Sequence, residues 1–130
     1  MIVIEPTTDF SELRKGPRER AEESVKVWRV RYGDDNDSPD HTLIYFGIIS
    51  TNAICAQGVI WAQPAAALFE APLGVRKEAA TAWRSFSALR PWQLLAFCDR
   101  DSRVNARFLQ FLGFAPYTAD AEYEYFQGQF

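Results

Sequence analysis

The sequence predicts one α+β domain, built on a mixed β-sheet with helices packed against it. Two β-rich segments, Thr42–Ile49 and Ala53–Trp61, are separated only by the short polar link 50–52, which predicts an antiparallel hairpin. The nearly unbroken apolar segment Trp92–Cys98 predicts a strand near the centre of the sheet. Amphipathic helices are predicted before and after that strand, so the early hairpin and the later βαβ crossovers together give a mixed sheet.

One strand and two helices are predicted ahead of the hairpin. Met1–Glu5 alternates weakly, as a first strand does, and a short helix is predicted over Phe10–Leu13. A second helix is predicted over Pro17–Arg29, because proline suits a first helical position and apolar residues then recur at helical spacing. The acidic stretch 33–40 lacks the spacing of a calcium-binding loop, so we interpret it as a solvated turn.

The remaining elements alternate between strand and helix. Gly113 is predicted to end the last helix, because glycine adopts the left-handed cap conformation readily. In chain order these elements are a strand at Ala65–Glu70, a helix at Arg76–Leu89, the strand Trp92–Cys98, a helix at Arg103–Leu112, and strands at Phe114–Tyr117 and Tyr123–Phe126.

Composition and charge exclude several classes of protein. The net charge of −3 argues against general nucleic-acid binding, which needs a concentrated basic surface. Cys55 and Cys98 lie in apolar segments and are expected to be reduced, and His41 is the single histidine, so no metal site is expected. No signal peptide and no membrane-spanning apolar run is present. We therefore expect a single domain over residues 1–130 that works in the cytoplasm.

The order of elements and the segment Asn105–Phe114 resemble the GCN5-related N-acetyltransferase (GNAT) fold. Members of this family often have an Asn, a short helix with an aromatic and apolar face, and then Leu-Gly-Phe, which is 112–114 here. The segment Asp99–Phe114 is also similar to small GNAT-like proteins encoded by tailed bacteriophages, some of which lie among virion and assembly genes. The resemblance implies a GNAT-like mixed sheet flanked by helices.

The resemblance also implies where acetyl-coenzyme A (acetyl-CoA) would bind. In GNAT enzymes a glycine-rich turn opens the helix after the central strand, and its backbone N–H groups hold the pyrophosphate. The matching stretch Leu73–Ala80 contains one glycine, and Glu78 would bring negative charge close to the phosphates. Arg76 and Lys77 are the candidates for holding an anion with their side chains. Asn105 matches the family's Asn, which can contact cofactor, although a local cap or turn role is the alternative.

The catalytic groups implied by the resemblance are incomplete. The family often has a Tyr four residues before the Gly-Phe glycine, as general acid for the departing thiolate, and this position is Leu109 here. A Glu near the central strand often acts as base or orders a water. Glu70 is the candidate for this role, and an ordinary strand-end carboxylate is the alternative.

Two functions from different classes follow from this pattern. The first is a non-catalytic structural or assembly protein of phage origin, which needs no cofactor and acts through contacts with other protein subunits in the host cytoplasm or in the virion. The alternative is an acyl-CoA-dependent N-acetyltransferase with an atypical cofactor loop, and a phosphate-cupping turn at Leu73–Ala80 would favour it. A third option is a module that binds a small molecule without the chemistry.

The missing glycines and the missing general acid favour the first function, so we expect neither tight binding of acetyl-CoA nor useful acetylation of amines. The aromatic content of 15% suits a protein that buries surface against partners, although a ring-rich core also explains it. These aromatic residues include four tryptophans, Trp28, Trp61, Trp83 and Trp92.

Overall fold

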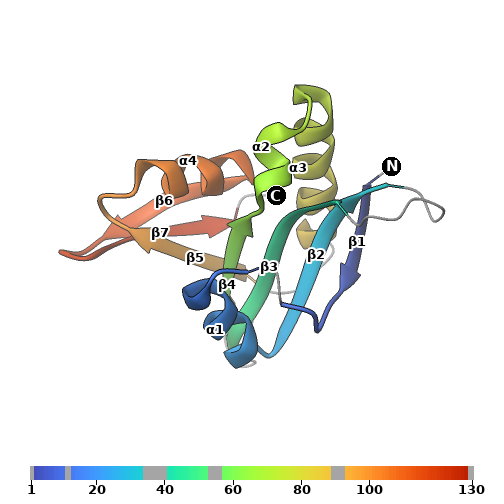
Figure 1. The fold of residues 1–130 in the computed structure, drawn as a ribbon. Helices are drawn as coiled ribbons and strands as arrows, with labels where there is room; N and C mark the ends of the chain where they lie inside the picture. The colour runs from blue at the N-terminus through green and yellow to red at the C-terminus, as the bar shows by residue number, and fades with distance from the viewer. Residues whose placement is uncertain (1, 11–12, 34–40, 53–56, 89–92, 129–130) are drawn as a thin grey trace.

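The computed structural model describes residues 2–10, 13–33, 41–52, 57–88 and 93–128, and these form a seven-stranded sheet with helices on both faces (Figure 1). The strands are β1 (Ile2–Pro6), β2 (Lys26–Tyr32), β3 (His41–Asn52), β4 (Gln57–Pro64), β5 (Gln93–Asp99), β6 (Phe114–Ala119) and β7 (Tyr123–Gly128). The helices are α1 (Lys15–Glu23), α2 (Ala66–Glu70), α3 (Leu73–Ala88) and α4 (Arg103–Phe111).

The sheet is mixed, as predicted. Its strand order is β1-β2-β3-β4-β5-β7-β6, and β4 and β5 are parallel while the other neighbouring strands are antiparallel. The predicted strand Trp92–Cys98 corresponds to β5, which lies inside the sheet between β4 and β7. The predicted hairpin is the β3–β4 pair, but β3 continues through Asn52, so the polar link at 50–52 belongs to the strand.

The main core lies on the face covered by α3 and α4, and it is built from aromatic rings. Phe46 of β3 stacks on Trp28 of β2 with ring centroids 5.4 Å apart, and it meets Trp83 of α3 edge-on at 5.7 Å. Trp83 in turn contacts Phe114 of β6 at 5.4 Å. Phe108, Leu112 and Phe114 are buried in the same core, with exposed fractions of 8%, 0% and 3%. Much of the aromatic content therefore packs this core.

A smaller core on the opposite face fixes α1 to the sheet. Trp61 of β4 lies directly across from Gly47 of β3, and a Cβ atom on Gly47 would come within 2.8 Å of Trp61 Nε1. A glycine is required here because the indole ring rests on the strand backbone. Trp61 Nε1 donates a hydrogen bond of 2.7 Å to Ser24 Oγ, at the end of α1.

The predicted helix Pro17–Arg29 is wrong in its second half. α1 ends at Glu23 and the chain becomes β2 from Lys26. The helical spacing of Ala21, Val25 and Trp28 was misleading, because Val25 is 71% exposed, whereas the consecutive residues Val27 and Trp28 are buried on opposite faces of the sheet. Alternation across a strand buries both, which a single helix face cannot do.

The predicted strand Ala65–Glu70 is also wrong, because residues 66–70 form the short helix α2. Its two leading alanines are the strongest helix formers, and Leu68 is its buried anchor. The predicted helix Phe10–Leu13 falls partly on residues 11–12, outside the described residues, and neither Phe10 nor Leu13 is helical.

Some of the remaining predictions on single residues concern described residues, and others lie outside them. Cys98 is buried and unpaired, as expected, while Cys55 lies outside the described residues. Gly113 has φ of 104° and follows α4, which confirms its left-handed cap. Most of the acidic stretch at 33–40 is not described. Within the described residues, no helix has the length and apolar character needed to cross a membrane.

Candidate functional site

The parallel strands β4 and β5 separate soon after they meet. Gln57 pairs with Gln93, Gly58 with Leu94 and Val59 with Leu95. Beyond these pairs β4 continues to Pro64 and β5 to Asp99. Figure 1 shows the two strands pointing away from each other beyond this contact. The backbone groups of residues 60–63 that face β5 therefore have no strand partner on that side, which leaves an unpaired strand edge in the middle of the sheet.

A cavity of about 180 Å³ lies in this gap between β4 and β5. Ala96 and Cys98 of β5 face α4 and its core, so alternation along the strand turns Phe97 and Asp99 to the other side, where α1 lies. The gap is thus lined from both faces of the sheet. Its walls are Arg20, residues 60–63, residues 96–99, Asn105, Phe108, Leu109 and Tyr123.

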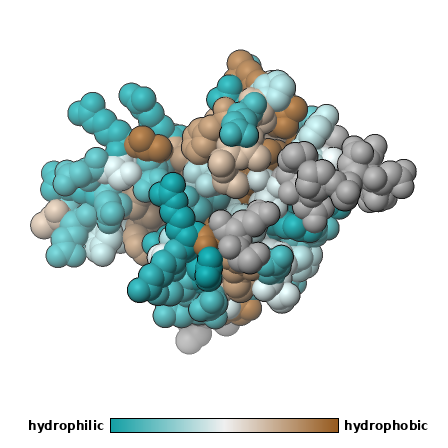
Figure 2. Space-filling model, viewed as in Figure 1, coloured by the Kyte–Doolittle hydropathy of each residue, from teal (hydrophilic) through white to brown (hydrophobic). Residues whose placement is uncertain are grey.

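Two further cavities continue from the gap toward the start of α3. The second, of about 620 Å³, shares Gln63 and Asn105 with the gap. The third, of about 290 Å³, shares Phe69 and Val104 with the second and lies between α2, the first turn of α3 and α4. We call these two cavities together the groove. Hydrophobic residues gather over α2 in the face shown in Figure 2, while α1, which lies below α2 in this view, is hydrophilic.

The far end of the groove carries positive charge. Arg76, in the first turn of α3, and Arg107 of α4 line the third cavity. The Nε atom of Arg76 is buried and has no hydrogen-bond partner among the described residues. A buried guanidinium N–H without an acceptor is costly, so this position suits an anion. The N-terminus of α3 lies in the same place and favours negative charge as well.

The site residues predicted from the sequence divide into two groups. Arg76 lines the groove, and Asn105 lines both the gap and the second cavity from the first turn of α4. The Asn105 backbone N–H donates to Ser102 Oγ, so Ser102, and not Asn105, is the helix cap. Lys77 and Glu70 are exposed and line none of these three cavities.

The stretch Leu73–Ala80, which the family resemblance matches to the cofactor loop, is helical in the structure. Residues 73–80 are the opening turns of α3, so they do not make the phosphate-cupping turn that would have favoured the enzyme. Glu78 is exposed and outside all three cavities, so its charge does not face the groove. The connection from β4 to α3 runs instead through the short helix α2.

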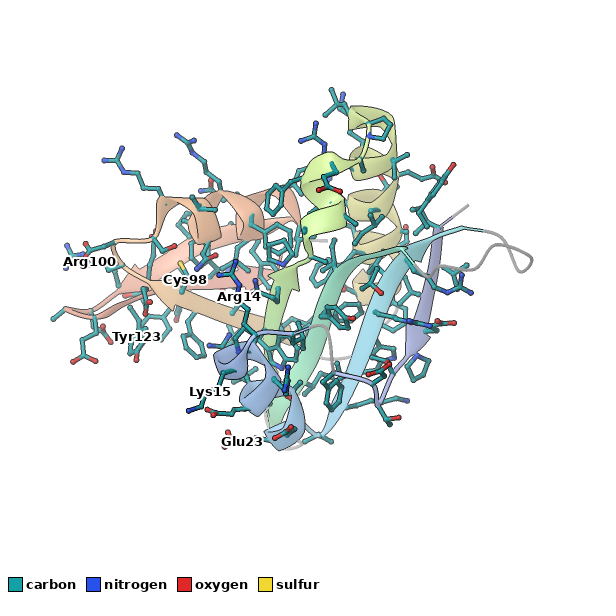
Figure 3. The ribbon with its side chains drawn as sticks, in the orientation of Figure 1. Arg14, Lys15, Glu23, Cys98, Arg100 and Tyr123 are labelled. Carbon is teal, nitrogen blue, oxygen red and sulfur yellow. The ribbon has the colours of Figure 1, made fainter. Side chains whose placement is uncertain are left out.

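The sequence analysis missed Asp99 and Tyr123, which line the gap from β5 and β7. They are direct cross-strand partners. A usable signal existed for Asp99, since a carboxylate directly after a buried apolar strand often lies at a site. Tyr123 gave none, because only the β5–β7 pairing brings it to the gap. Figure 3 shows Tyr123 and Cys98 on opposite sides of the sheet.

Two side chains of the gap are unsuited to proton transfer or nucleophilic attack. Burial, and after it the negative charges of Glu124 and Asp99, raise the pKa of the Cys98 thiol above its usual value. The thiol therefore keeps its proton and is a poor nucleophile. Leu109 is buried and lines the gap from α4, at the position where the family often has a tyrosine, and it supplies no proton.

Several acetyltransferases of known structure share this architecture. An IAA acetyltransferase from Bacillus cereus matches with a TM-score of 0.60 and 9% identity, over 98% of this chain and 99% of that one. A GNAT family acetyltransferase from Elizabethkingia anophelis with acetyl-CoA bound matches with a TM-score of 0.63 and 11% identity, over 99% and 98%. The chain has the GNAT fold. No family model and no curated protein matches its sequence.

These GNAT neighbours correct two expectations. The non-catalytic assembly protein of phage origin and the absence of a cofactor are both overturned, because the similar structures are acetyltransferases and two of them hold acetyl-CoA. Phage origin and incorporation in a virion find no support in the comparisons. The N-acetyltransferase alternative becomes the function to be tested, and at 8–11% identity its support must come from the site itself.

Proposed function

We propose that this chain is an acyl-CoA-dependent N-acyltransferase and that acetyl-CoA is its donor. The observation that carries the proposal is the gap between β4 and β5. It is lined from both faces of the sheet and leads into a groove that ends at a buried guanidinium N–H without an acceptor. Such a passage lets two substrates meet from opposite sides.

The gap and the groove together offer contacts to two chemical parts of acetyl-CoA, its phosphates and its amide-bearing arm. Arg76, Arg107 and the N-terminus of α3 can hold phosphates, so charged side chains do the work of the missing glycine-rich turn. The unpaired edge of β4 at residues 60–63 can hydrogen-bond an extended arm that contains amides, as a sheet edge does with an added strand. When bound, the donor supplies an activated acyl group as a thioester.

The chain's own residues can supply the proton transfers. An ammonium group must lose a proton before its nitrogen attacks, and the departing thiolate must gain one. Asp99 lines the gap and can hold the ammonium and accept its proton, and Tyr123, its cross-strand partner on the same face, can donate the proton that the thiolate gains. Arg20 is the other charged side chain that lines the gap.

Isothermal titration calorimetry with acetyl-CoA at low salt, followed by a thiol-release assay with mixed primary amines, tests the proposal. We expect a dissociation constant at or below about 10 μM, which corresponds to roughly −7 kcal/mol. Arg76→Ala should weaken binding at least about tenfold, because a charged hydrogen bond is lost. Lys77→Ala is the matched control, since Lys77 is the next residue but lies outside the groove. Absence of both binding and thiol release would refute the function.

A further inference from the structure

We propose that the acceptor is a primary amine that carries an aromatic ring, and that Phe97, Tyr123 and Tyr125 bind the ring beside Asp99. We call these three rings the aromatic platform. The inference rests on the proposed function, because it names the second substrate of the same transfer. Its test is nevertheless a binding measurement that does not need the donor.

The aromatic platform is a preorganised cluster. Phe97 meets Tyr123 edge-on with ring centroids 5.5 Å apart, and Tyr125 lies 6.4 Å from Phe97 and 6.5 Å from Tyr123. The Tyr125 hydroxyl donates a 2.7 Å hydrogen bond to Asp120, whose carboxylate also accepts the backbone N–H groups of Glu122 and Tyr123. The turn between β6 and β7 thus fixes two of the rings before any ligand arrives.

The aromatic platform lies on a part of the sheet that no described helix covers. Cross-strand pairing with Tyr125 and Tyr123 places Phe97 and Asp99 on the face opposite α4. α1 packs on that face against β3 and β4, in front of them in Figure 1, and its Arg20 lines the gap beside the platform. Phe97 is accordingly 39% exposed, unlike the rings of the main core. Ordinary core packing therefore does not explain this cluster.

Continuity with the gap indicates a small molecule as the occupant. Phe97 and Tyr123 belong to the platform and also line the gap, together with Asp99. A ring held on the platform can therefore place a short amine-bearing chain in a cavity of about 180 Å³, which is too small for a protein segment.

Charge selects an amine over an acid at this position. Asp99 ends β5 next to the rings, and the faces of aromatic rings themselves attract cations. Asp120 adds a second carboxylate at the Tyr125 end of the platform. Arg100, which follows Asp99 in sequence, donates a hydrogen bond to the Asp120 backbone carbonyl. Arg20 of α1 also lines the gap.

Three small probes separate the contributions of ring and charge. They are phenethylamine, 3-phenylpropionate with the same ring and the opposite charge, and hexylamine with the same charge and no ring. Binding to the full chain without donor is measured by calorimetry or ligand-observed NMR. We expect phenethylamine to bind at least about tenfold more tightly than either of the other probes, from its combined ring and ammonium contacts.

Substitutions then assign the preference to residues. Phe97→Ala should remove the preference for phenethylamine over hexylamine, while Phe97→Tyr keeps the ring and should retain it. Asp99→Asn should remove the preference for phenethylamine over 3-phenylpropionate. Tyr117→Ala is the control, because Tyr117 is a 65% exposed aromatic residue of β6 outside the platform, and it should change nothing.

The outcomes for acceptor and donor are distinguishable. Equal binding of the three probes, or a preference that survives Phe97→Ala, would overturn the aromatic acceptor even if acetyl-CoA binds and amines are acetylated. Selective binding of phenethylamine that disappears in Phe97→Ala supports the platform. If acetyl-CoA then fails to bind with phenethylamine present, the proposed function fails and the platform remains as a binding site.

Discussion

Tyr123 and Leu109 illustrate how single side chains divide the work in the gap. Leu109 occupies the position on α4 where the family often has a tyrosine, and it contributes only an apolar wall. A phenol reaches the same cavity from β7 instead. The sequence motif places only the α4 position. It could not reveal that the tyrosine in this cavity comes from β7, because strand pairing brings it there.

Tyr123→Phe should lower kcat for acetyl transfer by about 10²–10⁴-fold, the usual contribution of a general acid, and should leave the KM for phenethylamine nearly unchanged because the ring remains. Asp99→Asn should lower kcat and also raise that KM. Glu70→Gln tests the base expected from the family resemblance. If Glu70→Gln lowers kcat while Asp99→Asn does not, Glu70 carries the role proposed for Asp99.

Gly47→Ala should destabilise the fold by about 1–3 kcal/mol, because its methyl group would enter the space of the buried Trp61 ring. Urea denaturation measures the difference in free energy of unfolding. Gly74→Ala is the matched control, since nothing lies within 4 Å of its Cβ position and α3 should gain up to about 1 kcal/mol from the better helix former. Equal effects of the two substitutions would show that Gly47 is not in close contact with the indole.

At the scale of elements, the last helix is the part of the fold most securely tied to its sequence. α4 begins at a Ser102 cap and ends at the left-handed Gly113, and its apolar residues pack against β5 and β6. The predicted bounds differ from the structure by one residue. The bounds of α4 can be predicted from local sequence because its cap residue, its apolar spacing and its terminal glycine all indicate the same helix.

Leu112→Ala should cost about 2–5 kcal/mol of unfolding free energy, because the side chain is fully buried at the end of α4 and its removal leaves a cavity. Val104→Ala serves as the comparison from the same helix, since Val104 is 68% exposed and should cost under about 0.5 kcal/mol beyond helix propensity. A loss below about 1 kcal/mol for Leu112→Ala would show that this helix end is not part of the core.

The elements that the sequence analysis got wrong share a physical cause. β2 was taken for helix because Trp28 keeps helical spacing with Ala21, and α2 was taken for strand because an apolar run of five or six residues fits either structure. In both cases contacts with neighbouring elements determine whether the segment forms a strand or a helix. The candidate site was predicted only in part for the same reason: Arg76 and Asn105 lie on predicted helices, whereas Asp99 and Tyr123 meet only through strand pairing.

At the scale of the whole molecule, the first strand is tied to the sheet by charge. Glu5 of β1 accepts hydrogen bonds from Arg29 at 2.7 Å and Arg31 at 2.9 Å, both from β2. Burial alone would raise the pKa of Glu5, but the hydrogen bonds and charges of the two arginines outweigh it and hold that pKa below its usual value near 4.5.

Because the folded pKa of Glu5 is depressed, its contribution to stability is complete above the unfolded value near 4.5 and is lost as pH falls through the folded value. The difference in unfolding free energy between the natural chain and Glu5→Gln should therefore shrink on acidification over that window. Glu19→Gln, at an exposed position on α1, is the control and should show no such trend. A difference that stays constant with pH would contradict the role of the two arginines.

The short contact between β4 and β5 divides the sheet into two blocks. Strands β1 to β4 pair in the order in which they are synthesised, and β5 to β7 form a second block, so each can assemble from contacts that are near in sequence. The parallel contact joins them among the described residues over three pairs. Amide protons of residues 60–63 that face the gap should exchange quickly with solvent in the unliganded chain and slowly once a donor lies along that edge. Hydrogen exchange at those gap-facing amides would then report occupancy before any acyl group has moved.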